Sequence, residues 1–283
     1  LAAGQQEVDE VRLNKKRLIA ATQMFAATGD ARFSKTAARL YRKVGGIRSD
    51  TANGFEGDLG FSMLRFAAVP GVPRRLSQQI RQDYRRAMGE WNGWGAVSDQ
   101  ADAYGAYVDG YWWGSNGTKA RRGSVFTQAV VGGVDPARHS QAVNAASHYL
   151  HYLHGVNPMG LVYLSNMKAA GAERSVTTFY HAWFKDGSRD YDSTETSRFG
   201  PAPGFLVGGP NPGYARDACC AESCGGSGDK VCRRPEIVPP VGQPDAKSYG
   251  EFNDGWPLNS WSVTENSLGY QVAYLRLLSK FVQ

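Results

Sequence analysis

Helical periodicity runs through most of this 283-residue chain, and it constrains the fold more than any other feature. Apolar residues recur at helical spacing up to Gly29, a residue type that often ends helices, and they recur again after Asp30. No set of segments shows the alternating pattern of β-strands. The sequence therefore predicts an all-α protein with seven helices, over residues 11–28, 31–44, 57–68, 73–90, 119–131, 136–154 and 264–281.

The length and charge of the chain exclude some classes of protein. A chain of this length can bury one sizeable core, so we expect residues 1–283 to form a single domain. No run of about eighteen apolar residues occurs, which argues against a membrane span. The net charge is a mild +6. The one dense basic cluster has helical spacing, which favours a solvated helix face over a nucleic-acid site; it comprises Arg74, Arg75, Arg81, Arg85 and Arg86.

Two long connections, residues 91–117 and 156–260, are rich in Gly, Pro, Asn and aromatic residues. Loops of that length inside a compact domain are usually functional. We therefore look for a binding or catalytic site in these two segments and at the start of the helix that follows them.

Glu265 is a lone carboxylate close to Trp256 and Trp261. A carboxyl group near aromatic rings is desolvated, which favours its protonated form, and flat indole faces suit sugar rings. This pattern indicates a sugar-cleaving site. The alternative is that Thr264 caps the last helix, Glu265 complements the helix dipole in the first turn, and the tryptophans belong to the core.

Four sequence blocks occur in an order that resembles glycoside hydrolase family 9, the inverting cellulases. The first reads Tyr-Trp-Trp-Gly-Ser-Asn, the second ends in Gly-Val-Asn-Pro-Met-Gly, the third reads Gly-Phe-Leu-Val-Gly-Gly-Pro-Asn, and the fourth contains Glu265. The resemblance covers the chain from about Tyr111 to its end and is weaker before that. The blocks are residues 111–116, 149–160, 204–211 and 253–266.

The resemblance implies an (α/α)6 toroid that hydrolyses β-1,4-glucosidic bonds in cellulose or a related β-glucan with inversion. It implies that Glu265 is the general acid and that no cofactor is required for the chemistry. It also places His181 and Asp254 at the sugar. The alternative for His181 is a structural histidine whose hydrogen bonds are satisfied within the protein. We expect the groove to be lined by Trp256, Trp261, Trp112 and Tyr214. One departure is Trp183, which stands where the family pattern has an arginine.

The second carboxylate of an inverting enzyme has no counterpart in this sequence. In the family the base comes from an Asp-Ala-Gly-Asp type motif, and neither Asp102 nor Asp109 matches it. We therefore expect the chain to be the C-terminal portion of a longer catalytic domain, with part of the toroid. A preceding segment of the same enzyme would then be its partner and would supply the base.

The four cysteines lie within one loop, at Cys219, Cys220, Cys224 and Cys232. Their spacing lacks the paired knuckles typical of zinc sites, so two disulfides are favoured over zinc. The two adjacent cysteines would each pair with one of the other two. This pattern predicts an oxidising location, and hence a secreted or periplasmic protein.

A polar run after His181 offers several oxygen ligands. It consists of Asp186, Ser188, Asp190 and Asp192. Calcium accepts clustered carboxylates and hydroxyls, and members of the family often carry calcium near the cleft. The alternative is a solvated turn, because the spacing is not that of an EF-hand loop.

Two other functions remain compatible with the sequence. One is a catalytically silent toroid that binds carbohydrate through its aromatic residues, which the missing base motif favours. The other is an exo-acting hydrolase of cello-oligosaccharides or glucosaminides, which the sequence does not distinguish from an endo-acting enzyme.

Overall fold

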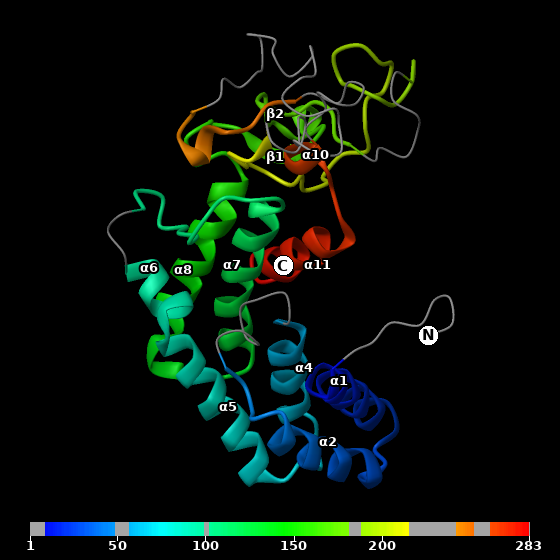
Figure 1. The fold of residues 1–283 in the computed structure, drawn as a ribbon, viewed down its shortest axis with the longest axis vertical. Helices are drawn as coiled ribbons and strands as arrows, with labels where there is room; N and C mark the ends of the chain where they lie inside the picture. Colours follow the sequence, from blue (N-terminus) through cyan, green and yellow to red (C-terminus); the bar gives the residue numbers. More distant parts are fainter. Residues whose placement is uncertain are drawn as a thin grey trace. The chain divides into compact units, whose positions relative to one another are not determined.

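The structure is a computed structural model that describes residues 9–48, 57–98, 102–180, 188–214, 242–251 and 261–282 (Figure 1). The chain divides into two compact units, each made from two stretches of sequence. The first unit contains residues 1–98 and 125–144, and the second contains residues 99–124 and 145–283.

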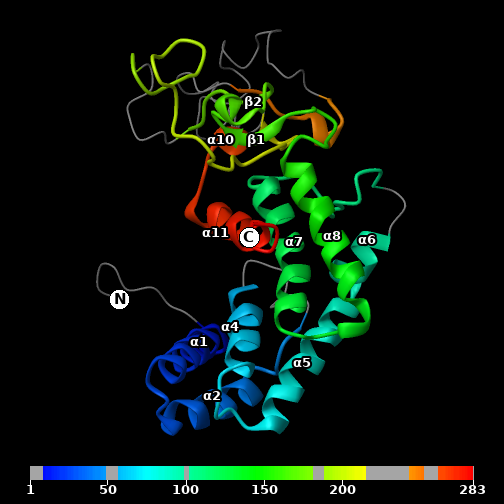
Figure 2. The ribbon, with the colours of Figure 1, turned by 180° about the vertical axis from the view of Figure 1, so that it is seen from behind.

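The first unit is built from helical hairpins that follow the predicted pattern. Its helices are α1 (Glu10–Thr28), α2 (Ala31–Lys43), α4 (Gly57–Ala67) and α5 (Arg74–Gly89). The first three lie together in both views (Figures 1 and 2). Gly29 ends α1 in the left-handed conformation, and the Asp30 carboxylate then accepts a hydrogen bond from Arg32 N and caps α2.

The core of the first unit is apolar and aromatic. Leu18, Ile80 and Met63 are fully buried, and the rings of Phe25 and Phe66 meet edge to face with their centroids 5.6 Å apart. Burial of these side chains gives the hairpins their stability, because each helix presents one apolar stripe that must be covered.

The basic cluster on α5 is largely exposed, and three of its arginines also hold parts of the first unit together. Arg81 Nε donates to the Gly132 carbonyl at 2.9 Å, and Arg86 pairs with Asp83 at 2.8 Å. Arg85 donates two hydrogen bonds to Asp135, at 3.0 and 2.7 Å. These contacts give the cluster a structural role besides contact with solvent.

The rest of the first unit consists of short elements and the ends of two longer helices. A π-helical turn over Trp91–Gly95 leads into α6 (Ala96–Ser98). The other contributions are the C-terminal part of α7 (Ser115–Val131), a 3-10 turn over Pro136–Arg138, and the N-terminal part of α8 (His139–Leu153).

The second unit adds a small sheet to the other parts of α7 and α8. Strands β1 (Val162–Ser165) and β2 (Ser175–Val176) are parallel, with Val162 opposite Ser175. Short 3-10 turns cover Lys168–Ala170 and Asp245–Lys247. The chain ends with α10 (Trp261–Thr264) and α11 (Leu268–Leu278), and β1, β2 and α10 lie together in both views (Figures 1 and 2).

The last predicted helix, over residues 264–281, is wrong at its start. Helix α10 ends at Thr264, and Glu265 and Asn266 then form β-bridges before α11 begins. Ser267 is the true N-cap, because its side chain accepts a hydrogen bond from Tyr270 N. The alternative in which Thr264 caps the helix and Glu265 occupies its first turn is therefore wrong as well.

The other six predicted helices are present with shifted ends, and α7 begins four residues before the predicted position. None of the helices in the described residues has the length and apolar character needed to cross a membrane.

A buried lysine is the least expected feature of the core of the second unit. Lys119 of α7 is completely buried and donates a hydrogen bond to the Ala106 carbonyl at 2.5 Å. Its ammonium group lies 3.8 Å from the ring centroid of Tyr152 and 5.1 Å from that of Tyr111. Burial lowers the pKa of Lys119 to about 7, partly opposed by the negative charge of Asp102.

This burial predicts a pH-dependent stability. The folded pKa of Lys119, about 7, lies below its ordinary value of 10.5, so the unfolded chain binds more protons between these two values. The free energy of unfolding should therefore rise with pH in this window, by up to about 1.4 kcal/mol per pH unit, and the full cost of burying the charge should be present below it. Urea unfolding at several pH values from 7 to about 9.5 measures this slope.

Lys119→Met is the matched control, since it keeps a long side chain without a titrating group. The variant should lose this contribution to the slope, while all other titrating groups stay the same. An identical pH dependence in both proteins would contradict the assignment.

Candidate active site

The predicted acid, Glu265, lies between α10 and α11 in a segment whose backbone is bonded to two distant parts of the chain. Gly208 N donates to Glu265 O at 2.7 Å. Tyr180 N donates to Thr264 O at 3.2 Å, and Tyr180 forms a parallel bridge with Glu265. Hydrogen bonds outside any helix therefore set the position of this residue.

Residues 204–211, called the glycine-rich loop below, are held by the start of α7. Asn116 N donates to Gly208 O at 2.9 Å, and Asn116 Nδ2 donates to Val207 O at 3.2 Å. Ser115 Oγ donates to Pro210 O at 2.7 Å. The family-like blocks at 111–116 and 204–211 are therefore in direct contact, and the loop connects the first of them to the segment of Glu265.

The glycine-rich loop also extends the small sheet. Val207 N donates to Tyr163 O at 3.2 Å and Ser165 N donates to Phe205 O at 3.0 Å, so residues 205 and 207 pair with β1. The backbone of Leu206 pairs with the side chain of Gln271 on α11. Leu206 N donates to Gln271 Oε1 at 2.9 Å, and Gln271 Nε2 donates to Leu206 O at 2.8 Å.

The side chain of Glu265 is bound by a tryptophan from the turn before α7. Trp113 Nε1 donates to Glu265 Oε2 at 2.7 Å, and the indole remains 43% exposed. Gly114 follows with φ of 82°, and a Cβ at this position would lie 2.3 Å from Tyr270 Oη. Glycine is therefore required here for Tyr270 to approach the turn. Burial and the charge of Glu265 raise the pKa of Tyr270.

The structure describes only some of the predicted substrate-binding residues. Trp112 is 43% exposed and presents part of its ring to solvent, whereas Tyr214 is only 2% exposed, which leaves little of its ring open to a ligand. Trp261 is the first residue of α10. His181, Asp254 and Trp256 lie outside the described residues, so the roles assigned to these six residues stay predictions.

The two aspartates considered as possible bases both have structural contacts. Asp102 accepts hydrogen bonds from Tyr104 N at 2.9 Å and Ala106 N at 3.1 Å, which fixes a turn. Asp109 pairs with the buried guanidinium of Arg122 at 2.6 Å. These contacts account for both carboxylates without a catalytic role.

The predicted calcium ligands are described in part. Ser188 Oγ accepts hydrogen bonds from Asp190 N and Tyr191 N, both at 3.3 Å, and Asp192 N donates to Ser197 Oγ at 3.1 Å. Within the described ranges, no three His, Cys, Asp or Glu side chains are grouped in a way that could hold a metal ion. Asp186 and the four cysteines at positions 219, 220, 224 and 232 lie outside these ranges, so the calcium and disulfide assignments stay predictions.

Two residues of the site region were not found from the sequence. Trp113 could have been suspected, because it lies in the family-like block beside Trp112, but the pattern does not say which indole faces the acid.

The second residue is Glu251, which belongs to no motif that the sequence analysis identified. Its carboxylate accepts hydrogen bonds from the backbone N and the hydroxyl of Thr177, and burial raises its pKa. Glu251 thereby anchors the segment that leads to Tyr180.

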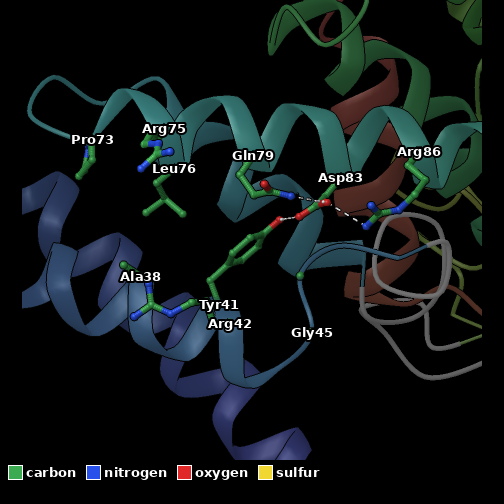
Figure 3. Close-up of a pocket in the computed structure, with 11 residues that line it drawn as sticks. Ala38, Tyr41, Arg42, Gly45, Pro73, Arg75, Leu76, Gln79, Asp83 and Arg86 are labelled. Atoms are coloured by element: carbon green, nitrogen blue, oxygen red, sulfur yellow. Dashed lines mark hydrogen bonds and ion pairs between the residues drawn. The ribbon is translucent and has the colours of Figure 1, made fainter.

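A separate pocket of about 630 Å³ lies between α2 and α5 in the first unit (Figure 3). Figure 3 shows Asp83 bound by three neighbours: Tyr41 Oη at 2.7 Å, Gln79 Nε2 at 2.9 Å and Arg86 at 2.8 Å. Burial raises the pKa of Tyr41, which therefore stays a donor. No predicted site residue lines this pocket. The buried Asp83 carboxylate connects α5 to α2 through its hydrogen bond from Tyr41.

Comparisons with known proteins agree with the resemblance seen in the sequence. The family model for Glycosyl hydrolase family 9 matches residues 6–278. No curated protein matches the chain.

Similar solved structures include AaCel9A in complex with cellobiose-like isofagomine (18% identity, TM-score 0.62, 95% of this chain and 43% of that chain). Another is a single mutant of a thermostable endoglucanase from Alicyclobacillus acidocaldarius (19% identity, TM-score 0.62, 97% of this chain and 44% of that chain). A third is a metagenome-derived glycoside hydrolase family 9 endoglucanase (17% identity, TM-score 0.65, 99% of this chain and 42% of that chain).

These likenesses confirm the predicted all-α fold of the (α/α)6 toroid type. The chain spans less than half the length of the solved structures that it matches, which agrees with the prediction of a partial toroid.

The contact between Asn116 and the glycine-rich loop can be tested with two glycine substitutions. Gly209 has φ of 91°, and a Cβ there would lie 2.3 Å from Asn116 Cγ. Gly204 has φ of 84° with no atom within 4 Å of a Cβ, so it carries only the backbone cost of a left-handed alanine, about 1 kcal/mol. Gly209→Ala should lower the free energy of unfolding by at least about 2 kcal/mol more than Gly204→Ala, because it also displaces Asn116.

Urea unfolding of both variants measures the difference. Equal losses would mean that the loop does not depend on close approach of Asn116.

Proposed function

The chain belongs to glycosyl hydrolase family 9, and we propose that it carries the acid side of an inverting β-1,4-glucan hydrolase of the endoglucanase type, with Glu265 as the general acid. The observation that carries the proposal is the fixed position of Glu265. Its backbone carbonyl accepts a hydrogen bond from Gly208 N, and the preceding carbonyl, Thr264 O, accepts one from Tyr180 N. Its carboxylate is bound by Trp113 at 2.7 Å.

The chemistry of the proposal requires a carboxyl group that is held in place and still reachable. Glu265 is partly exposed, so a glycosidic oxygen can approach it. A general acid protonates that oxygen as the bond to the sugar breaks, while a base on the opposite face activates water. The proposal assigns no base among the described residues, because Asp102 and Asp109 are engaged in structural contacts.

The proposed ligand is a β-glucan oligosaccharide or polysaccharide. Trp112 is 43% exposed, which leaves part of its indole ring open to solvent, and indole rings can stack on the C–H groups of sugar rings. A related enzyme of the same fold was solved with cellobiose-like isofagomine, which supports this class of ligand.

Three further proposals follow from the sequence. We propose that Cys219, Cys220, Cys224 and Cys232 form two disulfides, that the protein is secreted or periplasmic, and that the run from Asp186 to Asp192 binds calcium.

A second candidate function is a silent carbohydrate-binding toroid. The structural contacts of Asp102 and Asp109 favour it, because they leave the described residues without an evident base. In that case the chain binds cello-oligosaccharides but releases no reducing sugar.

The test of the acid is Glu265→Gln, which keeps the shape of the side chain and removes the proton. Reducing-sugar release from carboxymethylcellulose should fall by about 10²- to 10⁴-fold, while binding of cello-oligosaccharides should be retained. The control is Glu173→Gln, an exposed carboxylate of the second unit, which should keep its activity.

Full activity of Glu265→Gln on carboxymethylcellulose would refute the role of the acid. Wild-type protein that binds the oligosaccharides and hydrolyses nothing, even together with the preceding segment expected to supply the base, would establish the silent alternative.

A further inference from the structure

Trp113 and Glu265 are 152 positions apart in the sequence, and the indole of the first donates a hydrogen bond to the carboxylate of the second. The turn that carries Trp113 continues into Ser115 and Asn116, which bind the glycine-rich loop. The same loop binds the backbone of Glu265 through Gly208. The hydrogen bond from the indole to the carboxylate therefore joins two side chains whose starting points are fixed to a common element.

The indole N–H group can only donate a hydrogen bond. Glu265 Oε2, which accepts it at 2.7 Å, must therefore be an acceptor whether or not the carboxyl group is protonated. A proton on Glu265 is thereby directed to Oε1. After that proton has been donated to the glycosidic oxygen, both electrons of the O–H bond remain on the carboxylate. The hydrogen bond from the indole N–H group to the now charged Oε2 then becomes stronger.

We propose that Trp113 is a positioning residue for the general acid: it fixes Oε1 as the oxygen that carries the proton and stabilises the carboxylate formed when the proton is donated. This inference rests on the proposed function of Glu265. It assigns Trp113 a role in the proton transfer itself, which a residue that only packs against the sugar would not have.

The other groups that face this pair fit the assignment. Tyr270 of α11 lies against Gly114, directly beside Trp113, and it interacts electrostatically with Glu265 and with Arg121 of α7. The raised pKa of Tyr270 keeps its phenol neutral, so it adds no negative charge next to the acid. The segment at Tyr180 and the glycine-rich loop contact Glu265 through backbone groups.

The kinetic test compares Trp113→Phe with Trp112→Phe, an aromatic residue on the same turn whose indole is not bonded to Glu265 in the described structure. Trp113→Phe should lower kcat on an unactivated β-glucan by about 10- to 100-fold, the effect of losing a hydrogen bond to a charged group, with little change in KM. The loss should be smaller on an aryl cellobioside with a good leaving group, because that substrate needs less proton donation.

Trp112→Phe should change kcat on the two substrates by the same factor. Equal effects of Trp113→Phe on both substrates would overturn the positioning role, even if Glu265→Gln abolishes hydrolysis. Conversely, full activity of Glu265→Gln would refute the proposed function independently of Trp113.

A second measurement does not require hydrolysis. In a ¹⁵N-labelled sample, the indole Nε1–H signal of Trp113, identified by its loss in Trp113→Phe, should shift in Glu265→Gln, because the substitution replaces the carboxylate that accepts the indole hydrogen bond. The signal of Trp112 should be unaffected by this substitution. An indole signal of Trp113 that is unchanged in Glu265→Gln would overturn the inference, whether or not the protein hydrolyses a glucan.

Discussion

The glycine-rich loop is the element on which the arrangement of the second unit depends. One of its edges pairs with β1, its Gly208 carbonyl accepts from Asn116, and its Gly208 N–H donates to Glu265. A left-handed glycine at 209 leaves room for the Asn116 side chain. These contacts use main-chain N–H and C=O groups, which do not depend on the residue type. The loop therefore connects the turn before α7 to the acid through backbone hydrogen bonds. The sequence contributes the small residues that allow the close approach, and the side chains of Ser115, Asn116 and Gln271 add hydrogen bonds to the loop.

The parts of the fold that were predictable are those with local causes. The boundary between α1 and α2 follows from Gly29 and Asp30, whose conformational and capping preferences act within a few residues. The helical stripes of the first unit follow from apolar spacing for the same reason. The resemblance to the family also joined blocks that are distant in the sequence, and the structure places the blocks at 111–116 and 204–211 in contact.

The parts that were not predictable have distant causes. Residues 264–281 carry a helical pattern, yet bridges from Tyr180 and Val207 hold Glu265 and Asn266 in extended conformation. Long-range pairing thus overrides local propensity. The burial of Lys119 depends likewise on Tyr152, a residue on another helix. Trp113 and Trp112 are chemically alike, so only the fold decides which of the two binds the acid.

The contact between Gln271 and Leu206 has a consequence for the solubility of the protein. A strand at the edge of a sheet exposes unpaired N–H and C=O groups, which other chains can use to add a strand. The carboxamide of Gln271 satisfies both groups of Leu206 from a helix, in the way that a neighbouring strand would. At this position the sheet therefore ends without an open edge, and intermolecular β-pairing that could seed aggregation finds no free partner on Leu206.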